Sequence, residues 1–95
     1  MIQLKKKLMK KLRGFLMDEV IEKKIIEICS QAFEVDQKIV TKETSINNLH
    51  EWDSLAHLKL ILMIESFFEL NLDPIEIESI NDVSDIIKLV EKNTR

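Results

Sequence analysis

The chain has 95 residues, of which 45% are hydrophobic and 33% charged, and these proportions fit one water-soluble domain with a modest core. Its single cysteine excludes an intrachain disulfide and a cysteine-based zinc cluster, and no apolar run approaches the roughly 18 residues that span a bilayer. We therefore expect a globular protein of the reducing cytoplasm, without a metal site.

Charge is distributed unevenly along the chain. Of the 14 basic side chains, six lie in residues 1–13 together with no acid, and the other eight share the rest of the chain with all 17 acidic side chains. An acidic body repels nucleic acid, so we expect no nucleic-acid partner and instead partners with basic surfaces.

The N-terminal segment has a helical pattern of its own. Large apolar residues recur among the lysines at intervals of four, four and three positions, at Leu4, Leu8, Leu12 and Phe15. The only glycine, Gly14, is a natural break in this pattern. We expect residues 1–16 to form a basic amphipathic extension, lying on the body or in solvent, and residues 17–95 to form the domain. Attachment of the extension to an anionic membrane surface or to a partner enzyme is the alternative.

The first helix of the domain and a long loop come next. Apolar residues recur at helical spacing from Asp18 to about Phe33 and predict a helix, with Cys29 buried beside its apolar stripe. Polar residues then interrupt the pattern over residues 34–52, which we expect to form a long loop. Four apolar side chains are candidates for anchoring this loop to the core, namely Ile39, Val40, Ile46 and Leu49.

Three more helices are predicted in the second half. A strong apolar pattern predicts a helix over residues 54–70, and Pro74 suits the first turn of a short helix over residues 74–80. Asn81 or Asp82 then caps a last helix. The sequence thus predicts an all-α bundle of four helices, with a short third helix and a long loop between the first and second.

On a helical wheel, the helix over residues 54–70 has a broad apolar arc that we expect to face the core. This arc contains Ala56, Leu60, Ile61, Met63, Ile64, Phe67 and Phe68. The opposite arc contains the polar residues Lys59, Glu65, Ser66 and Glu69. Three leucines also fall inside the polar arc, namely Leu55, Leu58 and Leu62. Exposed leucines on adjacent turns predict a surface where a partner docks, with cover by the extension or the long loop as the alternative.

Ser54 is predicted to begin this helix, with Asp53 directly before it. The free N–H groups and the positive dipole at a helix start favour a phosphate ester on such a serine. Asp53 could cap the helix, or help to bind a cation while a phosphate-bearing group is transferred. Ordinary helix capping is the simpler explanation of the pair taken alone.

The sequence around this pair resembles a known motif. Residues 52–58 read Trp-Asp-Ser-Leu-Ala-His-Leu, which is similar to the Asp-Ser-Leu attachment motif of acyl carrier proteins, above all of the discrete carriers that have Trp before it. The resemblance runs without a gap from Asp53 to Val83 and covers about residues 18–93 in all. It includes apolar positions that the fold of this family needs, namely Leu60, Ile64, Phe68, Leu72, Ile80 and Val83.

The resemblance implies a specific function. Ser54 would carry a 4′-phosphopantetheine arm, transferred from coenzyme A by a magnesium-dependent phosphopantetheinyl transferase. The thiol of the arm, and not Cys29, would hold an acyl group as a thioester. The protein would be a monomeric carrier that catalyses no reaction itself, and its partners would be acyl-loading and acyl-transferring enzymes.

The resemblance also implies roles for other residues. Partner enzymes would touch the second helix through Leu55, Leu58, Lys59, Leu62 and Glu65. An acyl chain would be sheltered near Leu60, Ile64 and Ile80. Lys59 stands where carriers of fatty acid synthesis have an acid, and this departure predicts a specialised carrier with its own dedicated enzymes.

Other functions fit the sequence less well. Asp53, Ser54 and His57 are the residue types of a hydrolase, but His57 lies only one turn from Ser54 and is expected at the edge of the core. No glycine suited to an oxyanion hole is near, and His50, Glu51, Asp53 and His57 match no strong metal-ligand spacing. The alternatives that remain are an aminoacyl or peptidyl carrier and a helical interaction module without a prosthetic group.

Overall fold

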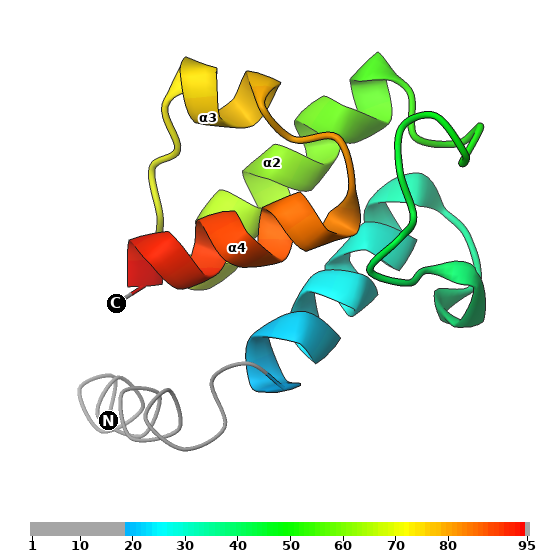
Figure 1. Cartoon of the computed structure of the whole chain (residues 1–95), viewed down its shortest axis with the longest axis horizontal. Helices are drawn as coiled ribbons and strands as arrows, with labels where there is room; N and C mark the ends of the chain where they lie inside the picture. Colours follow the sequence, from blue (N-terminus) through cyan, green and yellow to red (C-terminus); the bar gives the residue numbers. More distant parts are fainter. Residues whose placement is uncertain (1–18, 95) are drawn as a thin grey trace.

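The computed structural model describes residues 19–94, and the predicted extension of residues 1–16 lies outside them. Within this part, the chain is helical over residues 19–33 (the first helix) and forms a short 3-10 helix at Gln37–Ile39 (η1). Three further helices span Ser54–Phe68 (α2), Pro74–Glu78 (α3) and Val83–Thr94 (α4). Figure 1 shows α3 and the long loop at opposite sides of the molecule. The predicted all-α arrangement of four helices, with a short third helix and a long loop, is confirmed.

α2 ends two residues earlier than predicted. Its last residue is Phe68, because Glu69 adopts the left-handed conformation with φ 55°. The Leu70 N–H then donates to the Glu65 carbonyl at 3.0 Å, a bond that satisfies one of the free carbonyls at the end of the helix.

α3 and α4 also have defined ends. α3 ends at Glu78, two residues before the predicted end, and the hydroxyl of Ser79 donates to the Glu76 carbonyl at 2.7 Å. Such a side-chain bond competes with continued helix. Asp82 is the cap of α4, since its Oδ1 accepts the Asp85 N–H at 2.8 Å, and one of the two predicted capping residues is thereby confirmed.

Glu69 allows a test of the helix end. A side chain held in the left-handed conformation costs about 1 kcal/mol relative to glycine. We therefore expect Glu69→Gly to raise the free energy of unfolding, measured by urea denaturation, by about 0.5–1 kcal/mol. Lys88→Gly, at an exposed position within α4, is the control and should lower it by about 1 kcal/mol. Equal destabilisation by both substitutions would contradict this helix end.

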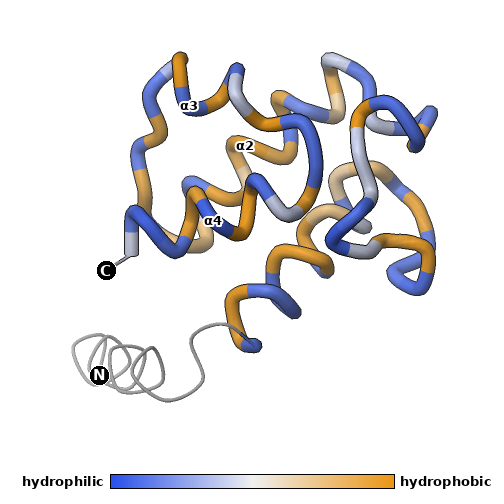
Figure 2. Tube along the Cα trace, in the orientation of Figure 1, coloured by the Kyte–Doolittle hydropathy of each residue, from blue (hydrophilic) through white to orange (hydrophobic). Residues whose placement is uncertain are grey.

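One hydrophobic core joins the helices and the loop. Its completely buried side chains include Ile25 and Cys29 of the first helix, Leu60 and Ile64 of α2, and Val83, Ile86 and Val90 of α4. Figure 2 shows the corresponding alternation of hydrophobic and hydrophilic residues along the helices. Within its own bounds α3 has no buried side chain, and the buried Leu72 and Ile80 flank it on either side.

Phe67 departs from the predicted core arc of α2. Its side chain is 46% exposed. It lies at the edge of the arc in the last turn of the helix, where the Lys24 ammonium is 4.7 Å from its ring centroid and Phe68 packs edge-on against it. Phe67 thus contacts a cation and one neighbouring ring and is not buried in the core, so the prediction that it faces the core is wrong.

The long loop is fixed by main-chain hydrogen bonds to the start of α4. Three such bonds of 2.9–3.1 Å join residues 42–46 to residues 81–84, and Ser45 pairs with Asp82 as an isolated β-bridge. Thr44 is buried within this contact, and its hydroxyl accepts the Thr41 N–H at 2.9 Å. These bonds explain how a long connection without regular structure remains part of a compact core.

Only two of the four predicted loop anchors are correct. Val40 is buried and Leu49 packs against the core, whereas Ile39 and Ile46 are 54% and 41% exposed. Ile46 is held by its main chain, which pairs with residue 81, and Ile39 ends η1, a helix without any buried residue. The strongest anchor is Trp52 at the end of the loop, with 2% of its surface exposed.

Candidate functional site

The local structure at the start of α2 presents Ser54 to solvent. Ser54 is the first residue of the helix and is exposed, as is Asp53 before it. Asp53 is the cap, because its Oδ1 accepts the Ala56 N–H at 2.8 Å and its carbonyl accepts the His57 N–H at 2.9 Å. The predicted capping role of Asp53 is confirmed, and the Ser54 hydroxyl lies at the positive end of a helix of 15 residues.

Two main-chain donors remain free beside this hydroxyl. Within the described chain, the N–H groups of Ser54 and Leu55 have no hydrogen-bond partner, whereas the next two N–H groups are bound by Asp53. Free N–H groups at a helix start attract negative charge. The position therefore suits a serine that carries a phosphate ester.

His57 is engaged on both sides of its ring. Its Nδ1 accepts the indole Nε1–H of the buried Trp52 at 3.0 Å, and its Nε2 lies 3.4 Å from the carbonyl oxygen of Ile77. The Trp52 ring also packs on Phe33, with 4.7 Å between the ring centroids. With both nitrogens engaged in this way, His57 is not placed as a general base for Ser54.

The predicted docking residues divide into two groups. Leu55, Leu58 and Leu62 are 74%, 56% and 58% exposed, and Lys59 beside them is exposed and has no ion pair within the described chain. The long loop does not cover them. Glu65 differs, because it is half-buried and its Oε2 accepts the Leu72 N–H at 2.9 Å. Its carboxylate fixes the segment before α3, a role that the sequence did not indicate.

The residues predicted to shelter an acyl chain lie together in the core. Leu60 and Ile64 of α2 have no exposed surface, and Ile80, directly after α3, is 2% exposed. All three belong to the single core cluster. Because protein interiors are close-packed, a chain could enter here only if these side chains move aside.

No protein-family model matches the chain, but known proteins are similar to it in sequence. The acyl carrier protein of Porphyromonas gingivalis is 31% identical over 75 residues, which cover 79% of this chain and 96% of the relative. The acyl carrier protein of Thermotoga maritima is 34% identical over 74 residues, which cover 78% of this chain and 91% of the relative. The chain belongs to the acyl carrier protein family.

A solved structure of an acyl carrier protein agrees with this assignment. The holo acyl carrier protein from Geobacter metallireducens has a TM-score of 0.68 and 32% identity, covering 76% of this chain and 83% of that one. The predicted family and carrier function are thereby confirmed, and with them the 4′-phosphopantetheine prosthetic group. As an acyl carrier protein, the chain interacts with acyl-handling enzymes and with a phosphopantetheinyl transferase, and it is not itself an enzyme.

Cys29 is the only cysteine of this acyl carrier protein, and it lies in the core with no exposed surface. Burial raises the pKa of its thiol from 9.0 to about 12. A buried, protonated thiol is not available to hold an acyl group, so the prediction of a core cysteine is confirmed.

The raised pKa makes the acyl carrier protein sensitive to alkaline pH. The protonated Cys29 thiol contributes fully to stability below pH 9, and this contribution is lost towards pH 12. The reason is that between these pH values only the unfolded chain gives up the thiol proton. Relative to Cys29→Ala, we expect the free energy of unfolding of the wild type to fall by about 1.4 kcal/mol between pH 8 and pH 10. Urea denaturation of both proteins at both pH values measures this, and parallel behaviour of the two would contradict it.

The sequence missed the connection between Trp52, His57 and α3. A signal was present in the sequence. A buried indole N–H needs an acceptor, and His57 follows Trp52 by five residues, in the first turns of α2.

Among residues 19–94, no three His, Cys, Asp or Glu side chains gather to hold a metal ion, and no helix is long and apolar enough to cross a membrane.

Proposed function

We propose that this acyl carrier protein holds its acyl group as a thioester on a 4′-phosphopantetheine arm attached to Ser54, and delivers it to dedicated enzymes. The observation that carries the proposal is the position of Ser54, exposed at the first residue of α2 and within the Trp-Asp-Ser-Leu sequence of residues 52–55. A reducing cytoplasmic setting suits a chain whose single thiol is buried and unpaired.

The residues around Ser54 fit the arm. The Ser54 hydroxyl is accessible to a transferase, and its Oγ would bond to the phosphorus of the transferred group while the bond from that phosphorus to the nucleotide part of coenzyme A breaks. Asp53 keeps the helix capped through Oδ1, and its second oxygen is available to help hold magnesium during transfer. The free N–H groups of Ser54 and Leu55 then favour the phosphate charge. When bound, the arm supplies a flexible tether that ends in a thiol.

The exposed face of α2 is the proposed docking surface for partner enzymes, and it consists of Leu55, Leu58, Lys59 and Leu62. Three leucines that are each more than half exposed on adjacent turns form an apolar patch next to Ser54. Lys59 gives this patch a positive charge, and Glu65 at its far edge is bound to the Leu72 N–H. We therefore propose partners that place an apolar surface, with an acid near Lys59, against α2.

Charge reversal at Lys59 tests the docking surface. We expect Lys59→Glu to lower kcat/KM for loading by the native acyl-loading enzyme by about tenfold, because it would face an acid of the partner. Lys88→Glu, an equal charge change at an exposed position of α4, should leave loading within about twofold. Initial rates of thioester formation measure both. If the Lys59→Glu variant is loaded at the wild-type rate, Lys59 is not part of the docking surface.

Intact-mass measurement tests the proposed function itself. Coexpressed with a broad-specificity phosphopantetheinyl transferase, the wild type should gain the mass of one arm, located on the peptide that contains Ser54. Protein isolated from its own host should also carry an acyl group that hydroxylamine releases, and the mass lost identifies the cargo, an aminoacyl group included. Protein that stays unmodified in cells whose other carriers are modified would overturn the proposal.

A further inference from the structure

A hydrogen bond between the side chains of Trp52 and His57 closes the turn that contains Ser54. The indole Nε1–H of Trp52 donates to Nδ1 of His57 at 3.0 Å, and Ser54 lies between the two residues in the chain. Inside this Trp52–His57 clasp, Oδ1 of Asp53 accepts the Ala56 N–H at 2.8 Å. The turn that presents Ser54 is therefore held by two side-chain hydrogen bonds, one nested inside the other.

The same imidazole reaches α3. Because an indole N–H only donates, Nδ1 of His57 carries no proton, and the proton of the neutral ring lies on Nε2. Nε2 is 3.4 Å from the carbonyl oxygen of Ile77, to which it donates. One neutral ring thus connects the end of the long loop, the first turns of α2, and α3.

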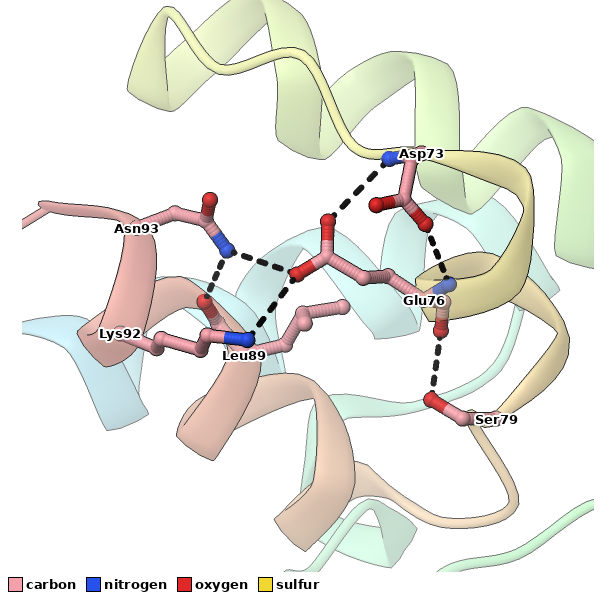
Figure 3. Close-up of polar contacts among 6 residues, drawn as sticks. All are labelled: Asp73, Glu76, Ser79, Leu89, Lys92 and Asn93. Atoms are coloured by element: carbon pink, nitrogen blue, oxygen red, sulfur yellow. Dashed lines mark hydrogen bonds and ion pairs between the residues drawn. The ribbon is translucent and has the colours of Figure 1, made fainter.

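α3 has a second polar attachment on the side of α4. The Glu76 carboxylate accepts the Asp73 N–H at 3.2 Å and the side-chain amide of Asn93 at 3.4 Å, as Figure 3 shows. The same carboxylate lies 3.7 Å from the Lys92 ammonium. α3 has five residues and no fully buried side chain. Its partly buried Ile77 packs against the core, and the polar contacts of His57 and Glu76 hold α3 on two sides. Such an element opens more readily than the core helices.

We propose that His57 is a positioning residue that couples the placement of α3 to the shape of the Ser54 turn. When α3 moves away from α2, His57 loses the Ile77 carbonyl and its ring is free to turn. The buried indole N–H of Trp52 then loses its acceptor, which is unfavourable, and the turn readjusts. An acyl chain that displaces α3 would in this way be sensed where the arm is attached, an extension that rests on the proposed function.

The only tryptophan reports on this coupling. In the full chain without the arm, Glu76→Ala loosens α3 from α4 and leaves both partners of the clasp in place. We expect hydrogen exchange of the Trp52 indole N–H, followed by NMR, to be about three to ten times faster than in the wild type. Lys88→Ala, at an exposed position of α4, is the control and should leave the exchange rate unchanged. Wild-type indole exchange in Glu76→Ala, together with faster exchange of the α3 amides, would overturn the proposal.

Substitutions of His57 test whether the coupling runs through this ring. His57→Gln retains one acceptor and one donor and should keep the effect of Glu76→Ala on the indole N–H. His57→Phe retains a ring without either hydrogen bond, and in this background Glu76→Ala should no longer change the indole exchange. A full effect of Glu76→Ala in His57→Phe would show a different route and overturn the proposal. These exchange measurements use protein without the arm. A negative result would therefore overturn the coupling through His57 without bearing on whether Ser54 is modified.

Discussion

Ser54→Ala is expected to remain entirely without the phosphopantetheine arm under conditions in which a transferase modifies the wild type to completion. The side chain of alanine has no oxygen to bond to phosphorus, and Ser54 is the hydroxyl that α2 presents at its exposed start. Intact mass before and after the transferase reaction measures the loss. A mass gain in Ser54→Ala would mean that another residue carries the arm.

The matched control is a second serine in the first turn of a helix. Ser84 follows Val83 at the start of α4, and Asp82 caps this helix much as Asp53 caps α2. Ser84 is half-buried and its N–H is bound to the Lys42 carbonyl, so it lacks the free surroundings of Ser54. Ser84→Ala should therefore be modified as fully as the wild type. Full modification of Ser84→Ala would show that a serine in a first helical turn near a capping aspartate is not sufficient, and that exposure and free N–H groups distinguish Ser54.

Loss of the arm in Ser54→Ala should not result from loss of the fold. Asp53, and not Ser54, supplies the cap, and alanine is well tolerated in a first helical turn. We expect the free energy of unfolding to stay within about 0.5 kcal/mol of the wild type. The effect of this substitution is therefore chemical.

Periodicity predicted the helices well because it reflects burial along a whole element. The buried positions Leu60 and Ile64, and the three exposed leucines of α2, were all on the predicted arcs. Helix ends were less predictable, since they depend on single residues such as Glu69 in a left-handed conformation. A pattern of apolar residues contains no information on that angle, and glutamate is not the residue expected there.

Contacts between distant parts of the chain could not be predicted from spacing. Ile46 looks like an anchor in the sequence, but its main chain pairs with residue 81, and the side chain is left at the surface. Glu65 looks like a surface acid, yet it binds the Leu72 N–H after the chain has turned back. In both cases a hydrogen bond to a distant main-chain group decides the position, and the residue types alone do not show which main-chain groups will become partners. The identity of Ser54 as the candidate site came from the motif, whereas its free N–H groups came from the structure.

Ile64→Ala is expected to lower the free energy of unfolding of the carrier without cargo by about 3–4 kcal/mol. Ile64 has no exposed surface, so its truncation removes buried methyl groups and leaves a cavity in the core. For a domain of this size, such a loss is a large part of the total stability. Leu62→Ala, on the opposite face of the same helix and 58% exposed in the wild type, should change it by no more than about 0.5 kcal/mol. Urea denaturation of both variants measures the difference, and similar losses in the two would contradict the assigned faces of α2.

The same variant tests where the cargo lies. If an acyl chain is sheltered near Leu60, Ile64 and Ile80, its methylene groups will fill the space that Ile64→Ala creates, at about 0.8 kcal/mol for each group buried. The loss of stability in Ile64→Ala should then be clearly smaller for the carrier loaded with a saturated chain of about eight carbons than for the carrier without cargo. In the wild type the chain must instead push apart close-packed side chains and move α3, which contacts its surroundings through Ile77 and through the polar contacts of His57 and Glu76. An equal loss with and without cargo would place the chain outside the core, and α3 would then have no need to move.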